Sequence, residues 1–108
     1  YGVIVTSVNN VSNSIPGNFI LHQNFPNPFN PTTKIKFDIP NSLSGDLSIV
    51  RLKIYDALGK EVQTLVNEKL SPGSYETEFN GSNLSSGMYF YKLESGDFVE
   101  TKRMILIK

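Results

Sequence analysis

The side chains that most often carry out chemistry are scarce in this chain. It contains a single histidine, His22, and no cysteine. A nucleophilic serine needs a histidine or another base beside it, and His22 stands in a proline-rich stretch where a surface position is expected. The acidic residues are scattered, and no Asp-x-Asp-x-Asp-Gly run for a cation is present. We therefore predict no catalytic residue, no metal site and no cofactor, and expect that the protein is not an enzyme.

Asp56 is the acidic residue with two competing interpretations. It could form an oxygen-ligand site with Asn80 or Asp97 if the fold brought them together. It also begins the turn sequence 56–60, which contains Gly59. An Asp side chain commonly accepts hydrogen bonds from the backbone two residues further on. Capping of the turn is therefore the role that we predict for Asp56.

The last residues of the chain are the best suited to binding a partner. Two basic residues precede the apolar run 104–107 and a lysine follows it. An extended receptor segment can pair with such a backbone as an added strand, while the basic side chains hold it electrostatically. The alternative is that this strand only completes a sheet, with its basic side chains facing water. The candidate partner-binding residues are Lys102, Arg103, Met104, Ile105, Leu106, Ile107 and Lys108.

Residues 24–31 alternate proline and asparagine around two phenylalanines. Each proline fixes its own φ and removes a backbone donor, and the residue before a proline is driven toward extended conformations. We expect a stiff, extended segment that is neither a helix nor a central strand. Residues 28–31 also match a Pro-x-x-Pro ligand, but a rigid brace over the edge of a sheet is the interpretation we favour.

Alternation of apolar and polar residues predicts the elements that position these segments. The expected strands cover residues 19–22, 33–39, 50–55, 61–66, 75–79, 88–93 and 98–107. About seven short strands with frequent turn signals are typical of a two-sheet sandwich. The shared parity within these runs predicts the following buried residues: Ile35, Phe37, Leu52, Ile54, Tyr75, Phe79, Tyr89 and Tyr91.

Several connections carry more specific expectations. The apolar residues of 61–66 fall on both faces, which a bulge or a helical turn would explain equally well. At least one of Gly59 and Gly73 is expected to have a positive φ, where a Cβ is unfavourable. Residues 41–46 are expected to form a turn, and residues 95–97 a hairpin connection.

Composition limits the partners and suggests a domain boundary. Ten basic and ten acidic residues give a formal net charge of zero, whereas nucleic acids and anionic membrane surfaces attract a positive excess. No run approaches the length of a transmembrane helix. The chain begins at Tyr1 rather than Met and has no leader pattern, which favours a fragment or a processed product. We assign residues 1–18 to a linker or the end of an upstream domain, and 19–108 to one folded domain.

Five sequence blocks give the chain a family resemblance. They run in order through a Gln-Asn-aromatic-Pro-Asn-Pro-Phe-Asn-Pro opening, an Asp-x-x-Gly turn, a Gly-x-Tyr element, a Leu-x-x-Gly-x-Tyr-x-Tyr element and a closing basic and apolar strand. The blocks are residues 23–31, 56–62, 73–75, 84–93 and 101–108. Together they resemble the C-terminal sorting domain of type IX secretion system cargo, and less closely the immunoglobulin-like domain of flagellar hook-capping proteins. The structural motif residues are Asn24, Pro26, Asn27, Pro28, Phe29, Asn30, Pro31, Asp56, Gly59, Gly73, Tyr75, Gly87 and Tyr89.

This resemblance implies an immunoglobulin-like topology and a function in sorting. It implies that an upstream cargo in the same chain is exported through the periplasm and outer membrane to the cell surface or the medium. The implied partners are the outer-membrane type IX translocon and a surface sortase-like protease. The alternative is a structural or adhesive β-sandwich that binds a carbohydrate or another partner in a multidomain extracellular protein. An adhesive module should tolerate changes at the chain end that would disable a sorting signal.

Overall fold

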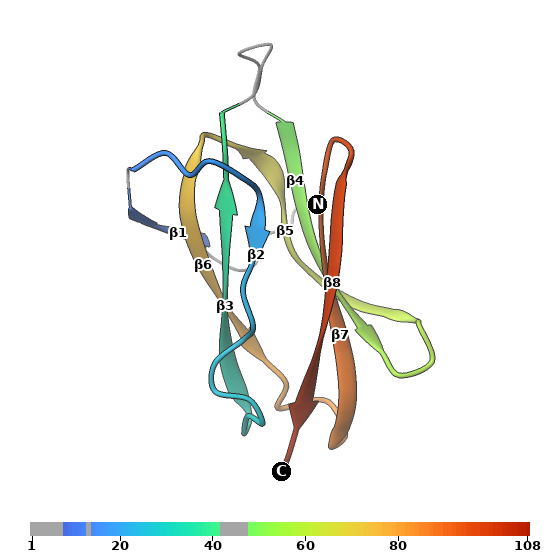
Figure 1. The fold of residues 1–108 in the computed structure, drawn as a ribbon. Helices are drawn as coiled ribbons and strands as arrows, with labels where there is room; N and C mark the ends of the chain where they lie inside the picture. Colours follow the sequence, from blue (N-terminus) through green and yellow to red (C-terminus); the bar gives the residue numbers. More distant parts are fainter. Residues whose placement is uncertain (1–7, 13, 42–47) are drawn as a thin grey trace.

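The computed structural model describes residues 8–12, 14–41 and 48–108, and every regular element within them is a β-strand. These residues form two antiparallel sheets of four strands, with the strand orders β1-β6-β3-β2 and β5-β4-β7-β8 (Figure 1). The predicted all-β sandwich is confirmed, with eight strands in place of about seven. The strands are β1 (Val8–Ser12), β2 (Ile20–Leu21), β3 (Thr32–Ile39), β4 (Ser48–Asp56), β5 (Glu61–Leu70), β6 (Gly73–Asn80), β7 (Gly87–Ser95) and β8 (Phe98–Leu106).

The core is made by the strand faces that sequence alternation predicts. Residues of one parity along β3, β4, β6 and β7 are buried, and their neighbours of the other parity are partly or fully exposed. Because successive side chains of a strand point to opposite faces, each strand gives one face to the core. All eight residues named above as buried belong to one apolar cluster, which Phe29, Met104 and Leu106 extend.

The strand order of the second sheet resembles the immunoglobulin arrangement, but in the first sheet β1, the first strand that the structure describes, occupies the edge beside β6 where that fold has strand D. The order β5-β4-β7-β8 corresponds to strands C′, C, F and G of that fold, and the neighbours β3 and β6 correspond to B and E. Tyr89, near the start of β7, donates a hydrogen bond from its hydroxyl to the Ser85 carbonyl at 2.7 Å. This contact has the form of a tyrosine corner, in which a tyrosine at the E–F connection bonds the backbone a few residues upstream.

β5 resolves one alternative that the sequence left open. Its pairing with β4 shifts register between Leu52 and Lys53, and again between Ile54 and Tyr55. The first shift leaves Leu65 as an extra residue, and Leu65 and Val66 are consecutive buried positions. Bulges, and not a helical turn, therefore bring apolar residues of both parities toward the core.

Two expectations for the first part of the chain are wrong. The linker expected up to residue 18 includes Val8–Ser12, which pair with β6 as an edge strand of the first sheet. The segment expected to be extended instead bends at residues 26–28 and 30–31. The bends allow Phe29 to reach the core, a tertiary contact that overrides the local preference for extended backbone. Apart from Asn41, the turn expected at residues 41–46 lies outside the described residues, as do residues 1–7.

The predicted turns contain the backbone conformations that their glycines indicated. Gly59 has a φ of 88° and Gly73 a φ of 153°, so both satisfy the expectation made for at least one. Gly73 also lies close to β1, where an added Cβ would stand 3.0 Å from Asn10 Nδ2. The hairpin between β7 and β8 turns through Gly96 and Asp97, with a φ of 57° at Gly96. This is the conformation that a type II′ turn requires at its first central residue.

Candidate functional site

The predicted partner-binding residues lie along the second half of β8, an edge strand of its sheet. Residues 22–31, here called the Asn-Pro segment, connect β2 to β3 and run beside that edge (Figure 1). The segment contains all seven motif residues of the opening sequence block. The candidate site is therefore a junction of two segments that are about 80 positions apart in the sequence, as Gln23 and Arg103 are.

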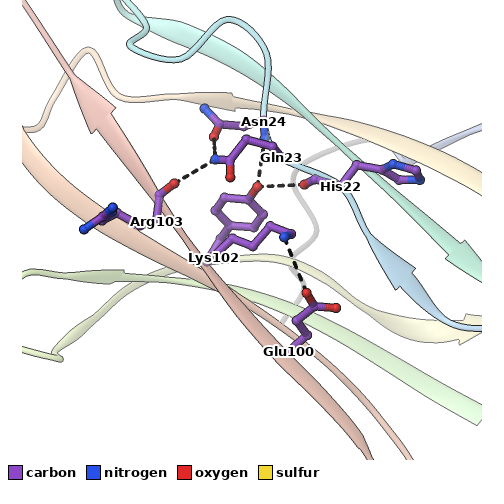
Figure 2. Close-up of polar contacts among 7 residues, drawn as sticks. His22, Gln23, Asn24, Glu100, Lys102 and Arg103 are labelled. Atoms are coloured by element: carbon purple, nitrogen blue, oxygen red, sulfur yellow. Dashed lines mark hydrogen bonds and ion pairs between the residues drawn. The ribbon is translucent and has the colours of Figure 1, made fainter.

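Side chains of the Asn-Pro segment occupy backbone groups on the outer edge of β8. Gln23 donates from Nε2 to the Arg103 carbonyl at 2.8 Å, a contact visible in Figure 2. Asn27 Oδ1 accepts a hydrogen bond from the Ile105 amide at 3.0 Å. An amide side chain thus takes the place of a neighbouring strand at each of these positions.

The backbone of Phe29 continues the pairing further along β8. Its amide donates to the Ile105 carbonyl at 2.9 Å, and its carbonyl accepts from the Ile107 amide at 2.9 Å. Phe29 and Leu106 form a parallel bridge. The Asn-Pro segment therefore acts as a short extra strand beside β8, which confirms the interpretation of the prolines as a brace over a sheet edge.

Tyr91 fixes the start of the segment to the second sheet. Its hydroxyl donates to the His22 carbonyl at 2.7 Å and accepts from the Asn24 amide at 2.8 Å. Burial raises the pKa of Tyr91 to about 12, while the hydrogen bond from Asn24 lowers it and the charge of Glu100 raises it. The neutral hydroxyl is the form that can both donate and accept here, so burial and hydrogen bonding require the same protonation state.

Asn24 is the most buried polar residue of the segment, with 2 % of its surface exposed. Its Nδ2 donates to Thr33 Oγ1 at 3.0 Å and to the Pro26 carbonyl at 3.2 Å. Its Oδ1 accepts from Gln23 Nε2 at 2.8 Å, and the Thr33 hydroxyl donates to the same Pro26 carbonyl. These contacts satisfy both ends of the amide, which is the condition for placing it inside the protein.

Phe29 anchors the segment through its side chain. Only 1 % of its surface is exposed, and its ring packs edge-on against Phe79 with centroids 5.9 Å apart. Gly81 lies beside this ring and donates from its amide to the Pro31 carbonyl. A Cβ at Gly81 would approach Leu106 Cδ2 to 3.1 Å and the Phe29 ring to 3.5 Å. The absence of a side chain at this position therefore permits the close packing of Phe29 against Leu106.

The candidate partner-binding residues divide by parity and do not form one surface. Met104 and Leu106 are core residues, and Lys102 forms an ion pair with Glu100 at 3.5 Å (Figure 2). Arg103, Ile107 and Lys108 are exposed, and Ile105 is partly buried. Lys108 is held by the loop between β6 and β7, because its Nζ donates to the Ser82 carbonyl and its amide to Ser86 Oγ.

The backbone of this strand is therefore less available than the sequence suggested. Strand addition was predicted over 102–108, but Gln23, Asn27 and Phe29 occupy the outer edge from Arg103 to Ile107. A partner can contact the outward side chains directly. A partner that pairs with the backbone must first displace the Asn-Pro segment.

Phe25 differs from Phe29, the other phenylalanine of the Asn-Pro segment, because 80 % of its surface is exposed. Its backbone pairs in both directions with Lys34, at 3.0 and 2.9 Å. It borders a hollow of about 400 Å³ on the face of the first sheet, whose remaining lining residues are His22, Gln23, Lys34, Lys36 and Glu76. His22 lies 3.4 Å from Asp38 through Nε2, at the surface as expected.

The remaining motif residues form the turns. Asp56 accepts from the amides of Leu58 and Lys60 through Oδ1, both at 2.9 Å, which confirms the predicted capping role. Tyr75 donates from its hydroxyl to the Ser71 carbonyl, and Gly87 begins β7 with a φ of 152°. Within the part of the chain that the structure describes, no three His, Cys, Asp or Glu side chains are grouped to hold a metal ion. No helix among these residues is long and apolar enough to cross a membrane.

Sequence reasoning did not single out Thr33, Gly81 and Tyr91 as partners of the Asn-Pro segment. Tyr91 was expected only as a core residue, and its hydroxyl contacts residues 67 and 69 positions away. The Asn-Gly pair at 80–81 predicts only a turn after the strand expected at 75–79. Nothing in the local pattern of either residue indicates which distant segment it contacts.

Comparison with known families supports the sequence blocks. The family model described as a secretion system C-terminal sorting domain matches residues 23–108. The match begins at Gln23, the residue that bonds Arg103, and includes both segments of the junction. No curated protein matches the chain.

Proposed function

Because the chain belongs to the family of type IX secretion C-terminal sorting domains, we propose that it directs an upstream cargo by binding the export machinery through the exposed side of β8. The family match over residues 23–108 is the observation that carries this proposal. The family is defined by a sorting signal and not by catalysis, and its role implies export to the cell surface or the medium. In this proposal the cargo passes through the periplasm, and the outer-membrane translocon and a surface sortase-like protease are the partners.

The accessible groups on β8 suggest how the signal is read. Arg103 and Ile107 are exposed on the side of β8 that faces away from the core. Met104 and Leu106, by contrast, hold the two sheets together. We assign recognition to the outward residues and stability to the inward ones. The backbone of the same strand becomes available only where the Asn-Pro segment leaves it.

A reporter fusion tests whether the domain is sufficient for sorting. The full chain is fused behind a periplasmic reporter and expressed in a host with type IX secretion and in the same host with its translocon inactivated. We expect the reporter at the cell surface or in the medium of the first host, and in the periplasm of the second. Equal surface delivery in both hosts, or none in either, would overturn the proposal.

Truncation of the end of β8 does not separate loss of recognition from loss of folding. Removing residues 103–108 deletes Met104 and Leu106 from the core, each of which is almost fully buried. Export would then fail through unfolding even if no receptor read these residues. Charge reversal of exposed Lys108 leaves Met104 and Leu106 in the core and removes only the bond of its Nζ to the Ser82 carbonyl. We expect Lys108→Glu to reduce surface delivery while cooperative unfolding is retained.

A further inference from the structure

Among the described residues, the Asn-Pro segment pairs with only part of the outer edge of β8. In an antiparallel strand, alternate residues turn both backbone groups away from the paired neighbour. The contacts of Phe29 show that Ile105 and Ile107 are such residues, and Val99 and Thr101 have the same parity. The described backbone contacts between segments cover the edge at Ile105 and Ile107, and none covers it at Val99 or Thr101.

The cover is the tip of a hairpin that has a firm base. At the base, Asn24, Thr33 and Tyr91 are buried and bonded to one another or to the adjoining backbone. The tip, loop 26–31, consists of exposed residues except for Phe29, which is buried, and Pro31, which is partly buried. Its contacts with the β8 backbone are one side-chain bond from Asn27 and two backbone bonds from Phe29. Departure of loop 26–31 from β8 would break these three bonds and the bond from the Gly81 amide to the Pro31 carbonyl, and would withdraw the Phe29 ring from Phe79, whereas the pairing of β2 with β3 would not need to change.

Loop 26–31 also covers the edge of β8 without presenting a new row of backbone donors to another strand. Three of its six residues are prolines and have no amide to offer to a further strand. Natural sheets protect their edges in this way, because an exposed row of backbone donors and acceptors pairs with other chains. The residues that are covered belong to the segment to which we assign recognition.

We propose that loop 26–31 is a removable cover over a strand-binding site on β8. The ligand is an extended segment of a partner protein that lies parallel to β8 at residues 103–107, where Phe29 now forms a parallel bridge. Such a ligand pairs with the Ile105 carbonyl and the Ile107 amide and places one large apolar side chain in the space vacated by the Phe29 ring. The uncovered stretch at Val99 and Thr101 lets the partner begin pairing before the loop departs.

Native-state hydrogen exchange of the unmodified chain tests whether the loop opens. Four consecutive amides provide the comparison: those of Met104 and Leu106 face β7, and those of Ile105 and Ile107 face the Asn-Pro segment. We expect the second pair to exchange at least tenfold faster than the first, with little dependence on urea, because opening of the loop is local. Equal rates for all four amides would mean that the cover leaves only on global unfolding, and would overturn the proposal.

A matched pair of variants identifies the loop as the cover. Asn27→Ala removes one bond to β8, and we expect the Ile107 amide to exchange several-fold faster although its own acceptor, the Phe29 carbonyl, is retained. Asn30→Ala alters an exposed residue of the same loop and should leave this rate unchanged. Equal effects of the two substitutions, or no effect of Asn27→Ala, would contradict the assignment.

A peptide added in trans tests the binding site itself. The probe is the acetylated and amidated heptapeptide Phe-Pro-Asn-Pro-Phe-Asn-Pro, which copies residues 25–31. We expect it to shift the amide resonances of Ile105 and Ile107 in the Asn27→Ala/Phe29→Ala variant, and to do so at least tenfold more weakly in the unmodified chain. A peptide with alanine in place of its second phenylalanine should not bind. If the double variant folds but shows no saturable peptide binding, the proposal is overturned. If the double variant does not fold, the hydrogen-exchange rates of the unmodified chain decide whether the loop opens.

The inference rests on the proposed function only in the identity of the partner. The exchange and peptide experiments need no secretion host, so they test the covered strand independently of sorting. If surface delivery fails while the peptide binds, the sorting proposal falls and the strand-binding site stands. If the reporter reaches the surface while the amides exchange only by global unfolding, the sorting proposal stands and the covered strand-binding site falls.

Discussion

Asn24 shows why a polar residue is retained inside the sandwich. Its amide is bonded to Thr33, Pro26 and Gln23, and its backbone amide to Tyr91. Removing the side chain would leave several of these buried groups without a partner. The cost of such an orphaned group exceeds the modest gain of the hydrogen bond itself.

Asn24→Ala should therefore be clearly destabilising. We expect a loss of about 1–3 kcal/mol in the free energy of unfolding, the usual cost of leaving a buried polar group unsatisfied. Urea denaturation followed by circular dichroism measures it. Asn30→Ala is the matched control, since Asn30 is exposed and should change stability by less than about 0.5 kcal/mol. Equal effects at the two positions would contradict the buried network.

Tyr91 gives the molecule a dependence on alkaline pH. Its pKa is raised from 10.0 to about 12 in the folded protein, so the folded state favours the neutral hydroxyl more than the unfolded state does. The stability that this provides is complete below about pH 10 and is lost as the pH rises through about 12. Tyr91→Phe lacks this titration. The difference in stability between the parent and Tyr91→Phe should shrink over that range, and a difference that is constant from pH 9 to 12 would contradict the raised pKa.

β4 is the element whose packing the sequence specified most completely. It lies between β5 and β7 and buries Val50, Leu52 and Ile54 with no measurable exposure. Strict alternation over these positions left only one possible register, since a slip by one residue would turn charged side chains into the core.

Ile54→Ala should cost about 2–5 kcal/mol of unfolding free energy, because the lost contacts and the remaining cavity both destabilise the folded state. Arg51→Ala, an exposed position of the same strand, is the control and should be close to neutral. Chemical denaturation of both variants provides the measurement. An Ile54 variant as stable as the Arg51 variant would show that the register of β4 is wrong.

Elements with local signals were predictable, and those defined by distant contacts were not. Alternation predicted the buried faces of β3, β4, β6 and β7, and glycine predicted two turns. β1 was missed because its residues, mostly Asn, Ser and Val, resemble a linker, and only pairing with β6 makes them a strand. The sequence of β5 did not distinguish a bulge from a helical turn, because both place adjacent apolar residues inward.

The junction of the Asn-Pro segment with β8 was predictable only in outline. The prolines predicted a brace over a sheet edge, and the structure has one. Which edge it covers depends on Gln23, Asn27 and Phe29 reaching residues 76 to 80 positions away. The partner-binding residues were chosen as a continuous run. The alternation of β8 instead divides them, because Met104 and Leu106 are needed in the core.

For the whole molecule, the central claim is that the outward side of the second half of β8 is a sorting signal. Val99 and Ile107 allow this to be tested within one strand. They have the same parity and similar exposure, 56 % and 51 %; Val99 lies near the start of β8, and Ile107 directly follows its end. A glutamate at either position adds the same charge to an exposed site, so general effects on solubility or folding should be alike.

The most direct measurement is the fraction of a periplasmic reporter that reaches the cell surface when fused to the Val99→Glu or the Ile107→Glu chain. The host has type IX secretion, and both domains are first shown to unfold cooperatively. We expect Val99→Glu to deliver the reporter as the parent does, and Ile107→Glu to leave most of it in the periplasm. Equal delivery by the two variants would contradict the claim, because the end of β8 would then carry no more of the signal than its beginning.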